Sequence, residues 1–223
     1  MGKLLAQTKV PFTPDINRGG ETFKKACALC HGNNGEGISM MMGPDKPALA
    51  PSLTAPNFLA LVDDDTFIQT VKQGRPGTGM IARNDVNEND ILDILAWLKD
   101  KSAKTGMKPS VSGVASKTKT YAGDAAKGKM SYMICQTCHG ADGMGYSSKS
   151  PLAIAGPAIG APGYVDLVGE DFIFQSTKHG RPPSLMAPLG LSDEQIGDVI
   201  AYLKELGIKN AAPKEAPKTE ASH

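Results

Sequence analysis

Apolar residues recur at helical spacing near the end of each half of this chain of 223 residues. The spacing i, i+3, i+4, i+7 begins shortly after Asn87 and again shortly after Ser192. It is typical of an amphipathic helix that buries one face against a core. Ser192 and Gln195 also form a capping box that begins the second of these helices. The two stripes consist of Ile91, Ile94, Leu95 and Leu98, and of Ile196, Val199, Ile200 and Leu203.

Four shorter helices are predicted upstream of these stripes, two in each half. A short amphipathic helix covers residues 20–27, with a partner over 127–135, and a middle helix covers 65–73, with a partner over 171–179. Each middle helix is followed by a glycine, the usual residue just past a helix end. Long Gly/Pro-rich loops connect the helices, and no run of β-branched strands stands beside them. The pattern predicts an all-α fold.

The chain repeats itself, which explains why the helices come in pairs. The Gly-Arg-Pro sequences at Arg75 and Arg181 match at an offset of 106 residues, and Gly20 matches Gly128 at 108. We therefore predict two tandem domains over 18–100 and 123–207. The remaining segments are predicted to be an extended arm over 1–17, a linker or strap over 101–122 and a disordered tail over 208–223.

Composition narrows the possible partners. The formal net charge is +1, so no strong field is present to attract nucleic acid or an anionic membrane. No apolar run approaches the roughly 18 residues that span a bilayer, and no apolar core of a secretory signal is present. We expect no transmembrane segment in this chain and no nucleic-acid partner.

All four cysteines lie in two copies of Cys-x-x-Cys-His. This motif is the covalent attachment signature of c-type haem, in which two thiols bond the porphyrin and the adjacent histidine binds the iron. We therefore predict two covalent haem c groups. A haem in each half would also supply flat apolar mass to a chain in which only 5% of residues are aromatic. The predicted residues are Cys27, Cys30 and His31, and Cys135, Cys138 and His139.

Zinc and dithiol chemistry are the alternatives for paired cysteines. Zinc ribbons usually separate the two pairs by about 15–20 residues, whereas here about a hundred residues lie between Cys30 and Cys135. Zinc also gives no reason for a histidine directly after each pair. A thioredoxin-like dithiol needs a βαβ setting, which is not predicted here.

The repeat selects the second axial ligands among ten methionines. Met80 and Met186 each lie five residues after the arginine of Gly-Arg-Pro, and no other methionine pair is reproduced. His179 is a competing ligand in the second half, but its equivalent is Gln73, so a surface or supporting role is favoured. The other methionines are interpreted as core filler or chance; they include Met40, Met41, Met42, Met130, Met133 and Met144.

Two further residue pairs are assigned to the haem surroundings. Pro51 and Pro157 lie where a backbone carbonyl would accept a hydrogen bond from the iron-bound histidine and fix its ring; the alternative is that they only stiffen loops. Arg75 and Arg181 would neutralise haem propionates through charge-assisted hydrogen bonds; the alternative is that they are solvated charges.

Each half resembles a class I cytochrome c domain, and the whole resembles a diheme class I cytochrome c. The resemblance is carried by the two haem motifs, the loops at Pro51 and Pro157, the two methionines and the two final helices. It implies that the first and last helices of each domain cross and that one haem edge reaches the surface.

The expected function is electron transfer through two His/Met-ligated haems between redox protein partners in the bacterial periplasm. The donor and acceptor are open and include a membrane-bound respiratory complex. Two alternatives remain: an electron-transfer subunit of a larger oxidoreductase complex, and a diheme enzyme of the peroxidase or thiosulfate-oxidising type. Because both halves offer the same ligand set, no catalytic residue is assigned.

Overall fold

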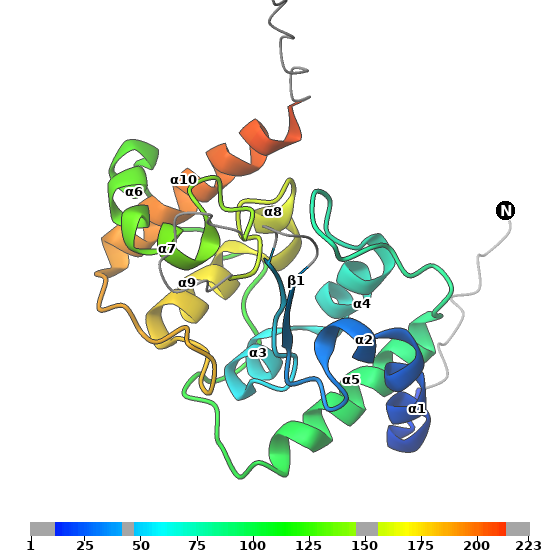
Figure 1. The fold of residues 1–223 in the computed structure, drawn as a ribbon. Helices are drawn as coiled ribbons and strands as arrows, with labels where there is room; N and C mark the ends of the chain where they lie inside the picture. The colour runs from blue at the N-terminus through cyan, green and yellow to red at the C-terminus, as the bar shows by residue number, and fades with distance from the viewer. Residues whose placement is uncertain (1–11, 42–46, 146–155, 213–223) are drawn as a thin grey trace, which may run out of the picture.

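A computed structural model describes residues 12–41, 47–145 and 156–212, in which two helical halves are joined by an extended linker (Figure 1). The first half contains α1 (Ile16–Ala26), α2 (Ala28–His31), β1 (Ile38–Met41), β2 (Pro47–Ala50), α3 (Pro56–Leu61), α4 (Asp64–Gln73) and α5 (Glu88–Ala103). The second half contains α6 (Ala125–Ser131), the 3₁₀ helix η1 (Tyr132–Ile134), α7 (Gln136–His139), α8 (Tyr164–Val168), α9 (Glu170–His179) and α10 (Asp193–Ala211).

The predicted all-α class is confirmed. Among the described residues the structure adds an antiparallel hairpin in which β1 pairs with β2, with Ile38 opposite Ala50. The sequence predicted only a long loop there, and residues 42–46 of that loop lie outside the described part of the chain. Helices α3 and α8 were also not predicted, because six and five residues are too few to display a helical period.

The first and last helices of the first half cross closely, as the sequence resemblance implies (Figure 1). A β-carbon added to Gly19 of α1 would lie 2.1 Å from the carbonyl oxygen of Asp93 in α5, so the crossing requires a glycine. The carboxylate of Asp93 accepts a hydrogen bond from the backbone N–H of Asp15 at 2.6 Å. Phe23 packs against Trp97 beside this contact, with ring centroids 4.7 Å apart.

The second half repeats this crossing with α6 and α10. A β-carbon on Gly128 would lie 1.9 Å from the carbonyl oxygen of Asp198, and Asp198 accepts from the N–H of Asp124 at 2.7 Å. The structural equivalent of Gly128 is therefore Gly19 and not Gly20, which corrects the alignment made from sequence. The second half is one residue shorter between this crossing and its haem motif, and the tighter 3₁₀ turn of η1 accommodates the difference.

Both predicted stripes are buried. All eight of their side chains are at most 2% exposed, and the capping box of Ser192 and Gln195 is formed. The helix ends differ slightly from the predicted boundaries: α1 begins at Ile16, α5 continues to Ala103 and α10 continues to Ala211. The stripe of α10 continues to Leu206, which is 4% exposed, whereas the last residues of α5 and of α10 carry no further apolar stripe.

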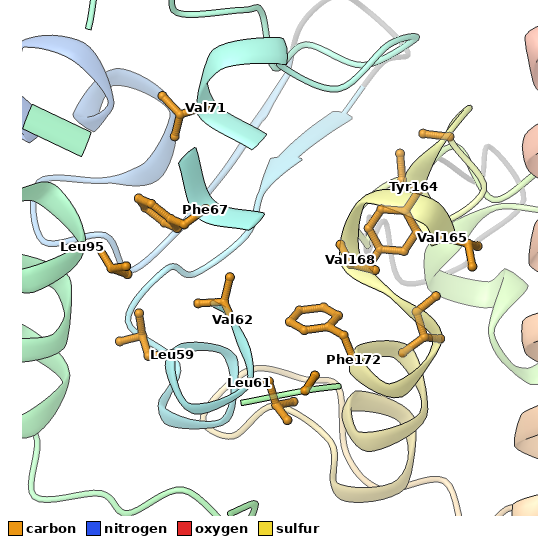
Figure 2. Close-up of a cluster of buried hydrophobic side chains, with 14 of the residues drawn as sticks. Leu59, Leu61, Val62, Phe67, Val71, Leu95, Tyr164, Val165, Val168 and Phe172 are labelled. Atoms are coloured by element: carbon orange, nitrogen blue, oxygen red, sulfur yellow. The ribbon is translucent and has the colours of Figure 1, made fainter. Parts of the chain in front are cut away.

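The two halves pack through equivalent elements. Helix α3 lies against α9, and helix α4 lies against α8. Because α8 is the equivalent of α3 and α9 the equivalent of α4, the same pair of elements meets twice across the interface. Figure 2 shows the apolar side chains on the two sides of this contact, with Leu61 and Val62 of the first half facing Phe172 of the second. Phe58 and Phe172 meet edge to face, with centroids 6.2 Å apart. The apolar core thus continues from one half into the other.

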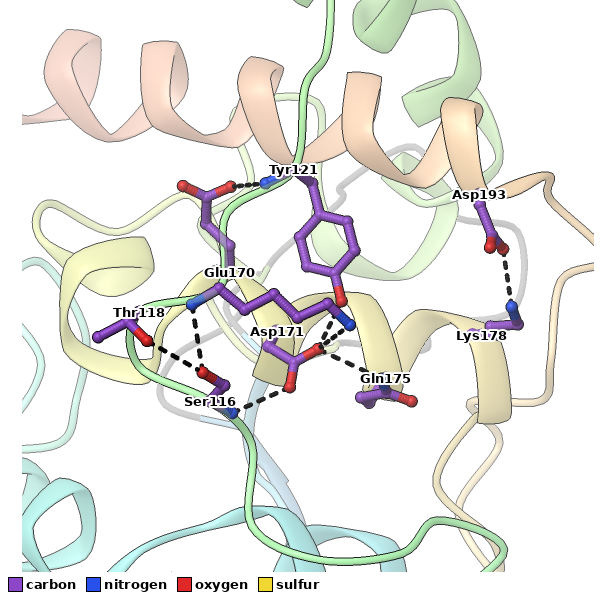
Figure 3. A network of polar contacts seen from close by, with 9 residues as sticks. Ser116, Thr118, Tyr121, Glu170, Asp171, Gln175, Lys178 and Asp193 are labelled. Atoms are coloured by element: carbon purple, nitrogen blue, oxygen red, sulfur yellow. Dashed lines mark hydrogen bonds and ion pairs between the residues drawn. The ribbon is translucent and has the colours of Figure 1, made fainter.

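The linker is bonded to both halves as a strap. The N–H of Ala115 donates to the carbonyl of Leu61 at 2.9 Å in the first half. Figure 3 shows the contacts with α9, where Asp171 accepts from the N–H of Ser116 at 2.9 Å and from the hydroxyl of Tyr121 at 2.5 Å. Tyr121 also stacks on Phe174, with centroids 4.1 Å apart.

Several sequence predictions concern residues outside the described ranges: most of the arm over 1–17, residues 213–223 of the tail, and Met42 among the methionines interpreted as filler. Of the methionines interpreted as filler, Met144 packs against the core, whereas Met130 and Met133 are exposed and fill no core. Within the described residues, no helix is both long and apolar enough to cross a bilayer.

Candidate haem sites

The two Cys-x-x-Cys-His motifs adopt the same local structure. Each begins at the junction between the first helix region and a single helical turn, α2 or α7. The N–H of His31 bonds the carbonyl of Cys27 at 2.9 Å, and the N–H of His139 bonds that of Cys135 at 2.9 Å. This turn gathers the two cysteines and the histidine of each motif within one short segment. Both histidines are buried, at 8% and 7% exposure.

Each histidine ring is oriented by a proline carbonyl. The Nδ1 of His31 lies 3.0 Å from the carbonyl oxygen of Pro51, and that of His139 lies 2.8 Å from the carbonyl oxygen of Pro157. With Nδ1 donating to the carbonyl, Nε2 is the ring nitrogen left for a metal. Burial lowers the pKa of both histidines, the carbonyl opposes that shift, and a nearby arginine adds to it. The neutral imidazole that a metal requires is therefore favoured.

The cysteines do not form the alternative sites. The four cysteines form no disulfide with one another, and burial raises the pKa of Cys27 and of Cys135 to about 11. A reactive dithiol requires the opposite shift, because the thiolate is the nucleophile. Among the described residues, no three His, Cys, Asp or Glu side chains gather as a metal cluster, so the two cysteine pairs do not combine into a Cys₄ zinc site.

Met80 and Met186 lie on loops of matching geometry. The carbonyl of Met80 accepts from the N–H of Arg75 at 2.8 Å, and that of Met186 accepts from the N–H of Arg181 at 2.7 Å. A hydroxyl closes each loop from inside: Thr78 bonds the carbonyl of Arg75, and Ser184 bonds that of Arg181. Both methionines are partly buried. The repeat that selected them in the sequence thus persists in the backbone hydrogen bonds around them.

Arg75 and Arg181 meet at the interface between the halves. The guanidinium of Arg75 lies over the ring of Tyr164 at 4.9 Å, and that of Arg181 lies over the ring of Phe172 at 4.8 Å and that of Phe58 at 5.5 Å. The Nε of each arginine is buried and has no hydrogen-bond partner in the described part of the chain. Burial lowers the pKa of Arg181, and the like charge of Arg75 adds to that lowering.

Both arginines are partly buried, and among the described residues no carboxylate pairs with either guanidinium. An anion beside them would offset the cost of leaving the buried Nε donors unpaired. A haem carries carboxylates on its propionate chains, and each arginine is close enough to its own histidine to affect that histidine's pKa. The unpartnered Nε atoms and the oriented histidines therefore fit a haem in each half.

His179 lies elsewhere. Its side chain lines a groove beneath the linker together with Ser110, Val111 and Gln175, and no residue of the second haem motif lines that groove. Its backbone carbonyl lies at the interface, 3.5 Å from the side-chain nitrogen of Asn57. The surface or supporting role of His179 stays a prediction.

The interface residues were missed by sequence reasoning. Asn57 is 2% exposed and bonded to both the linker and the second half. Phe58 and Tyr164 are equivalent at the 106-residue offset, and each carries an arginine of the opposite half on its ring. A usable signal was present, since an aromatic residue follows Pro-x in both copies of a chain that is poor in aromatics.

Comparison with known proteins agrees with the tandem arrangement. Residues 14–98 match the family described as cytochrome c oxidase, cbb3-type, subunit III, and residues 125–207 match the cytochrome c family. Each matched range contains one Cys-x-x-Cys-His motif, and the two ranges cover most of the chain. No curated protein sequence matches the chain.

Three solved structures are similar at low identity. A chain of the reducing HAO-like protein complex of Kuenenia stuttgartiensis shares 19% identity with a TM-score of 0.55, over 89% of this chain and 99% of that chain. Cytochrome cL of Methylophaga aminisulfidivorans shares 24% identity over 43% of this chain and 70% of its own, with a TM-score of 0.29. Thiosulfate dehydrogenase of Marichromatium purpuratum shares 17% sequence identity over 90% of this chain and 48% of its own, with a TM-score of 0.35.

Of these three, the chain from Kuenenia stuttgartiensis has a TM-score above 0.5, and that match shows similarity of fold alone. The family matches are more informative, because each falls on one complete copy of the repeat and its haem motif. The chain therefore belongs to the diheme class I cytochromes c: it is an electron-transfer cytochrome built of two cytochrome c domains in tandem, which bind covalently attached haem c.

Proposed function

We propose that this protein carries electrons through two haem c groups, one in each of the domains 18–100 and 123–207. In this proposal the thiols of each motif would hold the porphyrin through thioether bonds, and a histidine and a methionine would bind each iron. The first site uses Cys27, Cys30, His31 and Met80, and the second uses Cys135, Cys138, His139 and Met186.

The observation that carries the proposal is the twofold repetition of one arrangement. In each domain a buried histidine is held through Nδ1 by a proline carbonyl, and a methionine loop is closed by the N–H of the Gly-Arg-Pro arginine. Chance does not explain why the same two hydrogen bonds, one to the histidine and one closing the methionine loop, occur at equivalent positions in both domains. A shared ligand set also leaves neither domain marked as catalytic, which favours electron transfer over an enzyme.

The bound haem would supply reversible Fe(III)/Fe(II) exchange, and histidine with methionine raises its potential relative to other axial sets. The protein residues orient the histidine, hold the methionine and limit access of water. Arg75 and Arg181 are proposed to bind propionates. Because these arginines meet at the interface, they would hold propionates of both haems beside the contact between the domains.

We further propose a periplasmic location and redox protein partners. Attachment of haem to Cys-x-x-Cys-His normally takes place outside the bacterial cytoplasm. The near-zero net charge favours docking through local apolar patches over long-range electrostatic attraction. Exposed Leu29 in the first haem motif and exposed Ile81 beside Met80 are candidate contacts of this kind.

A role as the electron-transfer subunit of a larger redox complex is the second candidate. Its support is that the chain of similar fold from Kuenenia stuttgartiensis, 99% of which is covered by the alignment, belongs to a protein complex. Co-purification of the native protein with a stoichiometric partner would favour this role. A protein that purifies alone and exchanges electrons with a soluble acceptor would favour the free carrier.

The proposal is tested on the protein produced with haem-maturation machinery. Intact mass should exceed the polypeptide mass by two haems, and the Fe(III) protein should give two low-spin histidine/methionine signals in electron paramagnetic resonance. A bare polypeptide would contradict the covalent haems. A high-spin or bis-histidine centre would contradict the ligand set and would favour the diheme enzyme.

A further inference from the structure

A buried amide joins the first domain, the linker and the end of α9. The Oδ1 of Asn57 accepts from the backbone N–H of Ser110 at 2.8 Å, and its Nδ2 donates to the hydroxyl of Ser110 at 2.9 Å and to the carbonyl of Gly180 at 2.9 Å. The N–H of Ser110 fixes which amide atom is oxygen, since only an acceptor fits there. All the main hydrogen-bonding positions of this buried side chain are therefore used.

The carbonyl of Gly180 and the N–H of Arg181 belong to one planar peptide group. The oxygen of this group accepts from Asn57, and its N–H donates to the carbonyl of Met186 at 2.7 Å. The peptide is thus held at both ends, and a hydrogen bond at the oxygen polarises the N–H at the other end. Rotation of this peptide would break both bonds, so Asn57 supports the closure of the Met186 loop.

The neighbouring backbone leaves little freedom for another arrangement. Gly180 has φ +65°, and a β-carbon there would lie 2.5 Å from the carbonyl oxygen of Met186. The methionine loop therefore packs directly on the peptide that Asn57 holds. A residue of the first domain thereby acts on a loop of the second domain without touching Met186 itself.

Among the described residues, no side chain gives the first domain an equivalent of this support. Its peptide between Gly74 and Arg75 also closes a methionine loop, because the N–H of Arg75 bonds the carbonyl of Met80 at 2.8 Å. The residue equivalent to Asn57 at the 106-residue offset is Gly163, which has no side chain to donate. The pseudo-symmetry of the interface is therefore broken at this position, and only the second methionine loop is supported across it by a side-chain amide.

We propose that Asn57 is a positioning residue for the second haem. Through it, the stability of the closed Met186 loop depends on the packing of the first domain against the second. This inference rests on the proposed role of Met186 as an iron ligand. When the amide is lost, the Gly180–Arg181 peptide is freed and the iron–sulfur bond of the second haem opens more often. The first haem, with its independent loop, keeps its properties.

The test uses the full-length haem-loaded protein with Asn57→Asp, which keeps the acceptor for Ser110 and removes the donor to Gly180. Asn57→Ala is a second variant, and Ser110→Ala is the control, since it keeps both the backbone bond to Oδ1 and the bond to Gly180. Exchange of the Arg181 amide hydrogen is measured by nuclear magnetic resonance, with the Arg75 amide as the internal reference. Imidazole binding to each Fe(III) haem is measured in parallel, with the haems assigned through Met80→Ala and Met186→Ala.

Loss of one hydrogen bond is worth about 1 kcal/mol, or about fivefold in an equilibrium. Both Asn57 variants should accelerate exchange at Arg181 and raise imidazole affinity at the second haem by about that factor, while Arg75, the first haem and the Ser110→Ala protein stay unchanged. Equal changes in both domains, or none at Arg181, would overturn the proposal. Absence of iron–methionine bonds in the wild type would instead refute the proposed function, and the amide exchange would still decide the role of Asn57.

Discussion

Arg75 of the first domain lies 4.9 Å over the ring of Tyr164 in the second, and the equivalent Arg181 lies 5.5 Å over the equivalent ring of Phe58. Each domain thus places its Gly-Arg-Pro arginine on an aromatic face of the other. Such contacts hold a cation without neutralising it. Among the described residues the two Nε atoms have no hydrogen-bond partner, so they are available to the propionates that we propose they bind.

Replacement of Arg181 by methionine should lower the potential of the second haem. A positive charge near the iron favours the reduced state, and a propionate left without its partner favours the oxidised state. Each 1.4 kcal/mol of lost differential interaction corresponds to about 59 mV for one electron, so we expect a decrease of several tens of millivolts in a spectroelectrochemical titration.

Lys99→Met serves as the control for Arg181→Met, because Lys99 is a half-exposed cation whose ion pair with Asp64 lies at the surface. This variant should leave both potentials nearly unchanged. Arg181→Lys should fall between the wild type and the methionine variant, since lysine keeps the charge but loses the planar fork of donors. Equal potentials in all four proteins would show that Arg181 does not bind a propionate.

Removal of the proposed distal ligands should open one haem at a time. Met80→Ala should permit carbon monoxide to bind the first haem, and Met186→Ala should permit it to bind the second, each with loss of half of the sulfur-to-iron charge-transfer absorption. The potential of the affected haem should fall, because the thioether stabilises Fe(II). Met133→Ala is the control, since that methionine is 62% exposed. Full retention of the band in either ligand variant would mean that another residue binds that iron.

The linker should loosen in acid through Asp171. Burial acts to raise the pKa of this carboxyl, but hydrogen bonds from Tyr121, Ser116 and Gln175 and the ammonium of Lys119 outweigh it and lower the pKa. The resulting stability is present above the unfolded value of about 3.9 and is lost as the pH falls through the lowered folded value. Asp171→Asn should thus cost about 1–3 kcal/mol at neutral pH.

The difference in free energy of unfolding between wild type and Asp171→Asn should shrink as the pH falls below about 4. Urea unfolding followed by circular dichroism at several pH values measures it. Asp166→Asn, at an exposed position of α8, removes the same charge and should change little at any pH. A constant difference across the pH range would show that ionised Asp171 does not hold the linker.

The helices and the two haem motifs were predictable because their signals are local. The stripe from Ile91 to Leu98 and the capping box at Ser192 depend on neighbours within one or two helical turns. The two methionines were chosen by internal repetition, which needs no structure. The carbonyl contacts of His31 and His139 were anticipated for the same reason, since Pro51 and Pro157 recur at corresponding places.

The interface was not predictable in this way. Asn57 gains its role from Ser110 and Gly180, which lie 53 and 123 residues away in sequence. The pairing of Arg75 with Tyr164 likewise joins different copies of the repeat, whereas comparison of the copies reveals only what they share within themselves. The alignment of the first helices was also missed, because the 3₁₀ turn of η1 compensates for one residue fewer in the second half and leaves no mark in the hydrophobic pattern.

The same substitution, glycine to alanine, should have opposite effects on stability at Gly128, which lies at a helix crossing, and at Gly207, which does not. In Gly128→Ala the new β-carbon would lie 1.9 Å from the carbonyl oxygen of Asp198, so α6 must move away from α10. In Gly207→Ala, within α10, the nearest atom is the carbonyl oxygen of Ala161 at 3.5 Å, an ordinary contact. We expect Gly128→Ala to destabilise the protein by about 1–3 kcal/mol or more, and Gly207→Ala to stabilise it by about 0.4–1 kcal/mol.

Because both substitutions add one methyl group to a helix, helix propensity favours both, and only the crossing separates them. Thermal and urea unfolding of the haem-loaded variants measure the difference. Stabilisation by both would mean that the β-carbon at position 128 has room, and the crossing in the second domain would then be wider than that at Gly19, where a β-carbon would lie 2.1 Å from the carbonyl of Asp93. If Gly128→Ala destabilises the protein and Gly207→Ala does not, the close contact between α6 and α10 requires a glycine at position 128.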